Sequence, residues 1–146
     1  MILQAILANK PAGFIAVAPE MRISAVIDIL AEKHIGAVLV VRPQNDLVGI
    51  LSERDVVRTL AASAAATLEM TVAQLMTSNP ATATPATTVE EAMELMTNGR
   101  FRHLPVLEGG QLIGLVSIGD VVKARIDQQK YEVETLRTYV AGGASV

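Results

Sequence analysis

The sequence predicts a mixed α/β protein of two β-α-β-β-α repeats packed sheet to sheet about a pseudo-twofold axis. The first observation is a duplicated stretch: residues 47–57 (LVGILSERDVV) recur as residues 112–122 (LIGLVSIGDVV). The second is that the segments around each copy alternate apolar runs and helical periodicity in the same order. The third is size, because one unit of about 50 residues cannot bury both faces of three strands well. Packing the two units together solves this problem and leaves two equivalent clefts.

The elements of the first repeat follow from the spacing of its apolar residues. Ile23, Val26, Ile27 and Leu30 recur at helical spacing and predict an amphipathic helix. Residues 37–41 form a continuous apolar run, which is typical of a strand buried on both faces. In order, we expect a short helix within residues 1–10, a strand at 14–18, a helix at 21–33, a strand at 37–41, a turn at 43–46, a strand at 47–51 and a helix at 54–62.

The second repeat follows an Ala/Thr-rich linker and repeats this order. Its hairpin turn is one residue shorter, and Gly109-Gly110 suits a tight turn. We expect a linker at residues 63–69, a helix at 71–76, a strand at 81–84, a helix around residues 89–96, a strand at 103–107, a turn at 108–111 and a strand at 112–116. We therefore divide the chain into residues 1–66, the first repeat with a lead-in helix, residues 67–127, the second repeat, and residues 128–146, a helical extension and tail.

The last helix is predicted to run from Gly119 to about Tyr139 and departs from the repeat. Its apolar stripe follows the alternating spacing of four and three that coiled coils use, over fewer than three heptads. Two interpretations stay open: the helix packs on its own domain, or it contacts a second subunit. Residues 141–146 are expected to be a frayed tail. The stripe consists of Val122, Ile126, Gln129, Val133, Leu136 and Val140.

Composition argues against several classes of function. The chain is 51% hydrophobic, yet it has no apolar run of about 18 residues that would span a membrane. A net charge of −3 and 3% aromatic residues argue against nucleic-acid binding. The absence of cysteine excludes thiol chemistry, and the two histidines, His34 and His103, show no metal-ligand spacing. We expect no metal, no catalytic residues and, because the N-terminus lacks a secretory pattern, a cytoplasmic protein.

Each duplicated stretch carries Ser-x-x-Asp where a strand runs into a helix. One interpretation is structural, because a serine there caps the helix by bonding an exposed amide. The other is functional: a hydroxyl, a carboxylate and free helix amides lie together, and a carboxylate can accept hydrogen bonds from the adjacent hydroxyls of a ribose. The two interpretations are compatible at Ser52 and Ser117 and differ over Asp55 and Asp120, which a cap alone does not require.

These motifs, together with residues 101–106 (FRHLPV) and the strand-ending Pro19 and Pro85, resemble a tandem pair of cystathionine-β-synthase (CBS) domains, also called a Bateman module. The resemblance covers about residues 1–127 and is closest to small stand-alone CBS-domain proteins. It implies a regulatory module, without catalysis or a required cofactor, that binds an adenosine ligand such as AMP, ADP, ATP, a dinucleotide or S-adenosylmethionine. It also implies a homodimer, with an unknown protein target, and the C-terminal helix could contribute to the dimer.

The resemblance assigns residues to two clefts, one for each aspartate. The Asp is expected to hold the ribose and the Ser to contact ribose or phosphate, while apolar atoms of the other half contact adenine. For the main cleft, the Asp120 cleft, this set is Ser117, Asp120, Gly119, Arg102, His103, Ile15, Ile35, Gly36 and Ala37. For the second cleft, the Asp55 cleft, it is Ser52, Asp55, Arg54, Ala81 and Phe101, with residues 101–103 forming the adenine side.

The family pattern places a basic residue at the start of the second strand of the half that carries the Asp. This pattern gives Arg102 and His103 to the Asp120 cleft, whereas the Asp55 half offers only Gly36 and Ala37 there, with Arg54 or Arg58 on the helix as substitutes. A charge-assisted hydrogen bond is worth roughly 1.5–3 kcal/mol. The sequence therefore predicts tighter nucleotide binding at the Asp120 cleft. The alternatives are a dimerisation module without ligand, whose motifs only cap helices, and a nucleotide-processing enzyme.

Overall fold

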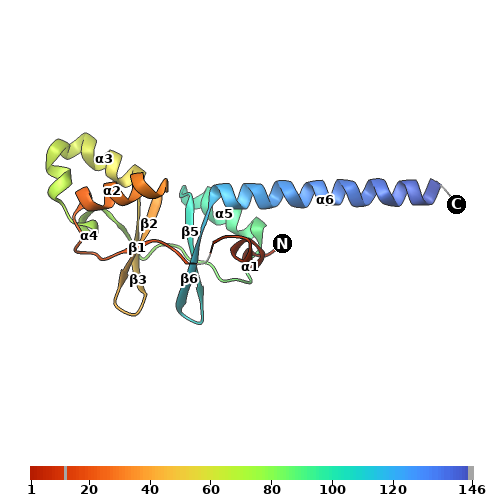
Figure 1. Ribbon diagram of the computed structural model, residues 1–146, viewed down its shortest axis with the longest axis horizontal. Helices are drawn as coiled ribbons and strands as arrows, with labels where there is room; N and C mark the ends of the chain where they lie inside the picture. The colour runs from red at the N-terminus through yellow and green to blue at the C-terminus, as the bar shows by residue number, and fades with distance from the viewer. Residues whose placement is uncertain (12, 145–146) are drawn as a thin grey trace.

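Two β-hairpins meet at the centre of the molecule, and helices cover their outer sides (Figure 1). The computed structural model describes residues 1–11 and 13–144. The first hairpin pairs β2 (Ala37–Arg42) with β3 (Asp46–Ser52), and the second pairs β5 (His103–Glu108) with β6 (Gln111–Ser117). Both are antiparallel, and β3 contacts β6 across the centre. This arrangement confirms the predicted mixed α/β fold of two packed repeats.

The two hairpins share their irregularities as well as their pairing. A bulge shifts the register between Val40 and Val41 in the first hairpin and between Val106 and Leu107 in the second. The shorter second turn places Gly109 and Gly110 at φ of 57° and 80°, the left-handed conformation that a tight two-residue hairpin turn requires. The duplicated sequence has therefore produced a duplicated backbone, in which even the β-bulge occurs at the equivalent position of each hairpin.

Six α-helices and one 3-10 helix lie around the hairpins in the described residues. Thr88 caps α5 by accepting a bond from the Glu91 amide, and Glu91 accepts a bond from the Thr88 amide in return. The helices are α1 (Leu3–Ala8), α2 (Ile23–Lys33), α3 (Glu53–Ser63), the 3-10 helix η1 (Ala64–Glu69), α4 (Val72–Leu75), α5 (Val89–Gly99) and α6 (Ile118–Ala144). None of the described helices combines the length and apolar character needed to cross a membrane.

Each repeat has its own buried core, and the short lead-in helices exchange partners between the cores. Leu3 and Ile6 of α1 pack with Leu104 and Val116 of the second repeat. Val72 of α4, near the start of the second repeat, packs instead in the core of the first. The N-terminal helix, predicted as a lead-in to the first repeat, thus completes the core of the second. This exchange ties the two halves of the chain together.

Several predicted elements differ from the structure. The strand expected at residues 14–18 is only β1 (Ala16–Val17), and the one expected at 81–84 is a single bridge between Ala83 and Val106. Both segments run parallel to the neighbouring hairpin strand. Each is soon followed by a proline, Pro19 or Pro85, which has no backbone N–H to donate, so the pairing stays short. The predicted linker at residues 63–69 is helical, because residue 63 ends α3 and the rest forms η1. The sequence did not predict β4 (Thr77–Ser78), which pairs with β3.

Helix α6 is longer than predicted and extends far beyond the hairpins (Figure 1). It was expected to end near Tyr139, with a frayed tail at residues 141–146. Residues 141–144 instead continue the helix, and residues 145–146 lie outside the described part of the chain. The prediction of a long final helix is confirmed, and its distal part stands clear of the body of the molecule.

Candidate functional site

Both Ser-x-x-Asp motifs form helix caps at the ends of β3 and β6. The Ser52 hydroxyl accepts a bond from the Asp55 amide at 3.4 Å, and the Asp55 carboxylate accepts one from the Ser52 amide at 2.9 Å. Ser117 and Asp120 make the same pair of bonds, at 3.1 and 2.9 Å. The aspartates therefore have a structural role after all, because each completes a reciprocal capping box. The caps fix the direction of each carboxylate relative to its helix.

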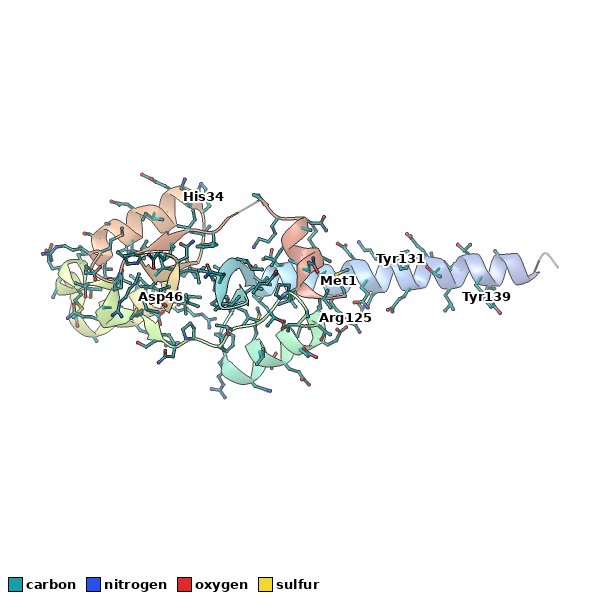
Figure 2. All side chains as sticks on the ribbon, turned by 90° about the horizontal axis from the view of Figure 1, so that it is seen from below. Met1, His34, Asp46, Arg125, Tyr131 and Tyr139 are labelled. Atoms are coloured by element: carbon teal, nitrogen blue, oxygen red, sulfur yellow. The ribbon has the colours of Figure 1, made fainter. Side chains whose placement is uncertain are left out.

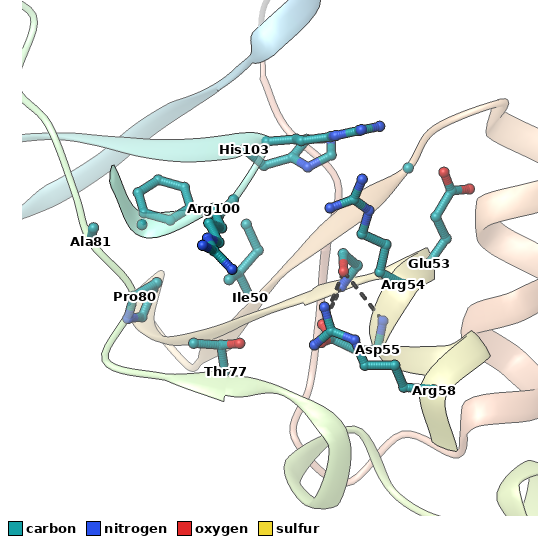
Figure 3. A pocket seen from close by; sticks show the side chains of 15 residues that line it. Ile50, Glu53, Arg54, Asp55, Arg58, Thr77, Pro80, Ala81, Arg100 and His103 are labelled. Carbon is teal, nitrogen blue, oxygen red and sulfur yellow. Dashed lines mark hydrogen bonds between the residues drawn. The ribbon is translucent and has the colours of Figure 1, made fainter. Parts of the chain in front are cut away.

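The Asp55 cleft is a cavity of about 340 Å³ between the two repeats (Figure 3). Ser52 and Asp55 lie on the first-repeat side, while Ala81 and Phe101 come from the second repeat. All five residues predicted for this cleft, Arg54 included, line this one cavity. The complete lining is Gly36, Ile50, Ser52, Glu53, Arg54, Asp55, Arg58, Thr77, Pro80, Ala81, Gly99, Arg100, Phe101, Arg102 and His103.

Four guanidinium groups surround this cavity: those of Arg54, Arg58, Arg100 and Arg102. Figure 3 shows Arg54 and Arg58 beside Asp55, and Arg100 facing them from the other repeat. Across the described residues, the ion pairs are Lys10–Asp120, Arg22–Glu69 and Arg125–Glu90, so none of the four belongs to one. Only Glu53 and Asp55 carry negative charge in the lining. The cavity is therefore cationic and suited to an anion.

The Asp120 cleft, also about 340 Å³, has a different character. Ser117 and His103 line it, as predicted, together with Ile15 and residues 35–37. Asp120 itself is not part of the lining, because the Lys10 ammonium lies 2.7 Å from its carboxylate and also donates to the Leu115 carbonyl. Gly119 does not line the cleft either. A ribose here would approach a carboxylate that already has a cation as partner.

The ion pair changes the acidity of Asp120. Burial raises the pKa of this carboxyl, but the hydrogen bonds from Lys10 and Ser117 and the charge of Lys10 outweigh burial and hold the pKa below its ordinary value. Asp120 is therefore ionised across the physiological range. Its charge is balanced within the protein, unlike the excess of guanidinium groups at the Asp55 cleft.

His103 stands between the clefts, since it lines both, as does Gly36. Burial lowers the pKa of this imidazole; Lys10 and Arg102 act in the same direction, whereas Glu53 and Asp120 oppose it. The ring is therefore neutral at pH 7 and can both donate and accept a hydrogen bond. A group bound in either cleft would come close to this side chain.

Residues 10–62 and 72–127 match the family model of the CBS domain. The chain is a tandem CBS-domain pair. Such pairs are regulatory modules, and the expected family is confirmed. CBSX3, a mitochondrial CBS domain-containing protein of Arabidopsis thaliana, is 39% identical over 118 residues, which are 78% of this chain and 57% of that protein. This chain thus spans little more than half the length of that relative.

Solved structures agree with the family assignment. A CBS-domain containing protein from Agrobacterium tumefaciens superimposes with a TM-score of 0.83 at 40% identity, covering 86% of this chain and 99% of that one. CBSX2, solved in complex with AMP, superimposes with a TM-score of 0.73 at 26% identity, covering 88% of this chain and 98% of that one. The fold of this CBS pair is therefore shared with a protein that binds an adenine nucleotide.

One predicted residue of the CBS pair lies at the other cleft. Arg102 was expected beside Asp120, but its side chain lines the Asp55 cleft. Its carbonyl accepts a bond from the Ile118 amide at 2.8 Å, which fixes this backbone against the start of α6. The Gly36 carbonyl, at the equivalent position, likewise accepts a bond from the Glu53 amide. The second-strand start of each half therefore lies between the two clefts: Gly36 and His103 line both, whereas Arg102 lines the Asp55 cleft and Ala37 the Asp120 cleft.

Sequence reasoning missed Arg100 and Lys10. Arg100 ends α5 in the left-handed conformation, at φ of 57°, as His34 ends α2 at φ of 53°. The repeat aligns these two residues, and each lines one cleft. The duplication was therefore the signal that could have found Arg100. Lys10 lies 110 positions from Asp120 and outside the segments matched between the two repeats, so no spacing pointed to it.

Proposed function

We propose that this CBS pair is a non-catalytic regulatory module that binds an adenine nucleotide in the Asp55 cleft. The observation that carries the proposal is the meeting of the Asp55 carboxylate with four guanidinium groups in a single cavity between the repeats, none of which forms an ion pair with a described residue. A nucleotide offers a matching pattern: adjacent ribose hydroxyls that donate, and phosphates that accept. The AMP-bound structure of CBSX2 supports the choice of adenine nucleotide.

The lining suggests how such a ligand lies. The ribose hydroxyls donate to Asp55, whose Oδ2 is held by the Ser52 amide at 2.9 Å and the Ser52 hydroxyl at 3.1 Å. Adenine contacts the apolar atoms of Ile50, Ala81 and Phe101. The phosphates then extend toward the guanidinium groups. The ligand contacts both repeats, so it binds some relative placements of the two halves more tightly than others. Binding therefore shifts the protein toward the placement with the higher affinity.

The Asp55 cleft replaces the Asp120 cleft as our preferred site. The sequence-based prediction of tighter binding near Asp120 depended on Arg102 and His103; Arg102 lines the Asp55 cleft, and His103 lines both clefts. At the Asp120 cleft, Lys10 is already paired with the aspartate. Binding a ribose there would compete with an ion pair, whereas the Asp55 cleft gains charge balance when phosphate enters.

Titration of the purified chain with AMP, ADP and ATP in a calorimeter tests the proposal. Asp55→Asn keeps an oxygen for the Ser52 amide but removes the charge, so the cap persists while ribose binding weakens. We expect a loss of roughly tenfold to a hundredfold in affinity, the equivalent of one charge-assisted hydrogen bond. Asp120→Asn is the matched control and should leave this affinity unchanged. The reverse result would place the ligand in the Asp120 cleft.

The alternatives are distinguished by two further measurements. A ligand at 100 times its dissociation constant stabilises a protein by about 2.7 kcal/mol, so a thermal shift with nucleotide separates a sensor from a purely structural module. Chromatography after incubation with ATP detects any product and so reveals an enzyme. The homodimer that the family resemblance implies stays a prediction, which sedimentation measures.

A further inference from the structure

The distal part of α6 has no counterpart in the CBS domains. The family match ends at residue 127, and the helix continues to Ala144. At 1.5 Å per residue, the segment 128–144 adds about 25 Å of helix. Figure 1 shows it projecting alone, away from the hairpins and from the other helices. A helix of this length without tertiary packing is marginal in water.

An apolar stripe runs along this helix, and it is exposed within the part of the chain that the structure describes. Val133, Leu136 and Val140 are 49%, 65% and 62% exposed, and the stripe begins on the body at Val122 and Ile126, which are 41% and 46% exposed. In heptad terms Ile126, Val133 and Val140 occupy a positions, while Val122, Gln129 and Leu136 occupy d positions. β-Branched residues at a with leucine at d favour two parallel strands. A polar residue at one core position, here Gln129, favours a single register.

The flanking charges select one orientation. The e positions are Lys123, Lys130 and Arg137, all basic, and an antiparallel pair would set this basic row against its own copy. In a parallel pair each g position faces the following e position of the partner, which brings Glu132 to Arg137 twice by symmetry. The one unfavourable parallel pairing places Arg125 near Lys130, but Arg125 lies 3.3 Å from Glu90 of its own chain. Charge complementarity therefore favours the parallel arrangement.

We propose that α6 pairs with α6 of a second copy of this chain as a short, parallel, in-register coiled coil through residues 122–140. The two CBS pairs then lie at the same end of the coiled coil, with their second repeats closest to the twofold axis. Figure 2 shows Tyr131 and Tyr139 carried on the same projecting segment. This pairing does not depend on the nucleotide proposal, and every test of it is run without nucleotide.

Single-cysteine crosslinking tests the register, because the chain has no cysteine of its own. In three separate full-length variants, Val133→Cys, Leu136→Cys and Val140→Cys, we expect a disulfide-linked dimer under mild oxidation. The matched control is Thr138→Cys on the outer face of the helix, which should stay monomeric under denaturing electrophoresis. An antiparallel pair can bring at most one position of the helix to its own copy. Crosslinking of only one variant, or equal crosslinking of the control, overturns the proposal.

A charge exchange tests the same pairing without oxidation. Glu132→Lys places like charges across the parallel interface and should shift the sedimentation of the dimer toward monomer. Adding Arg137→Glu in the same chain restores opposite charges and should recover the dimer. The two positions are five apart and do not face each other within one helix, so recovery reports contact between chains. A double variant no better associated than Glu132→Lys alone contradicts the proposal.

Discussion

One lysine makes the two equivalent carboxylates of this protein chemically different. Asp55 and Asp120 each complete a capping box, with Ser52 and Ser117 respectively, but only Asp120 has an ammonium 2.7 Å away. Lys10 comes from outside the duplicated pattern. A single residue beyond the repeat has thus broken the symmetry of the two sites, leaving one cleft charge-balanced and the other cationic.

Replacing Lys10 with methionine should make Asp120 resemble Asp55. The substitution removes the ammonium that lowers the pKa of Asp120, so the pKa should rise, because burial then acts with less opposition. A depressed carboxyl pKa contributes stability above the unfolded value, which is lost as pH falls through the folded value. Lys10→Met should therefore lessen the acid sensitivity that Asp120 causes. Carboxyl NMR titration measures the pKa of Asp120. The control is Lys33→Met, because Lys33 lines neither cleft. An Asp120 pKa that is unchanged in Lys10→Met would contradict the ion pair between Lys10 and Asp120.

His103 should make stability depend on pH just below neutrality. Burial lowers the pKa of the folded imidazole beneath its ordinary value of 6.5, so the unfolded chain binds more protons in the window between the two values. Stability is therefore complete above 6.5 and falls as pH decreases through this window. Denaturant unfolding from pH 7.5 to 5 measures this loss, and His103→Gln should reduce it.

Nucleotide should oppose the same effect. A phosphate bound beside His103 favours the charged imidazole and raises its pKa. The ring signals of His103 in NMR should therefore titrate at higher pH in the presence of ATP than in its absence. A ring that titrates above 6.5 without ligand would contradict the burial that the structure shows.

Residues that the motifs contain could be predicted, and residues that only the tertiary fold supplies could not. Ser52, Asp55 and Phe101 belong to duplicated or family-like stretches, and all three line the predicted cleft. Arg102 was assigned both to the phosphate side of the Asp120 cleft and, within residues 101–103, to the adenine side of the Asp55 cleft, and it lines the Asp55 cleft. Sequence position alone does not reveal which of two clefts a side chain at the start of a strand will line. The backbone at Arg102 is held by a bond from the Ile118 amide, a contact between the start of β5 and the start of α6 that no sequence pattern indicates.

At the scale of elements, equivalent glycines of the two β-strands face unequal neighbours. A Cβ added to Gly49 in β3 would lie 2.6 Å from the Met76 sulfur and 2.9 Å from the backbone carbonyl of Thr77 in β4. At Gly114 in β6, the nearest atom is the methyl end of the Leu7 side chain, at 2.7 Å. A backbone atom in a paired strand cannot move away as a flexible side chain can.

Gly49→Ala should therefore destabilise the protein more than Gly114→Ala. Forcing a methyl against fixed atoms typically costs about 1–3 kcal/mol, and relaxation of Leu7 should keep the second substitution at the low end of that range. Chemical denaturation of the two variants, which differ only in their neighbours, measures the difference. Equal losses would show that β4 moves as freely as the Leu7 side chain.

Elements with strong periodicity were predicted well, whereas short pairings were not. The stripe of Ile23, Val26 and Leu30 is buried in α2 as its spacing required. In contrast, residues 81–84 make one bridge, because a parallel segment beside proline gains few ladder bonds. The two residues of β4 carried no sequence signal, since their pairing is set by where the chain crosses β3 on its way to the second repeat.

On the scale of the whole molecule, the exchanged lead-in helices make the two repeats depend on each other. Leu3 of α1 is fully buried among residues of the second repeat, and its backbone amide donates to Thr87 at 2.9 Å. Val72 of α4 is fully buried in the first repeat, and its amide donates to Met21 at 2.8 Å. Each core is thus completed by a short helix that precedes the other repeat in sequence.

This dependence predicts one cooperative unfolding transition for the chain. Leu3→Ala removes a large side chain from the second core and should cost about 2–5 kcal/mol, because the cavity cannot collapse fully. Since α1 is joined to the first repeat, loss of its packing should lower the midpoint observed by probes in both repeats together. Gln4→Ala, on the exposed face of the same helix, should change stability by less than about 0.5 kcal/mol. If Leu3→Ala instead shows two separate transitions, with the first repeat unaffected, then the repeats unfold independently. In that case only a nucleotide bound between the repeats could couple the stability of one to that of the other.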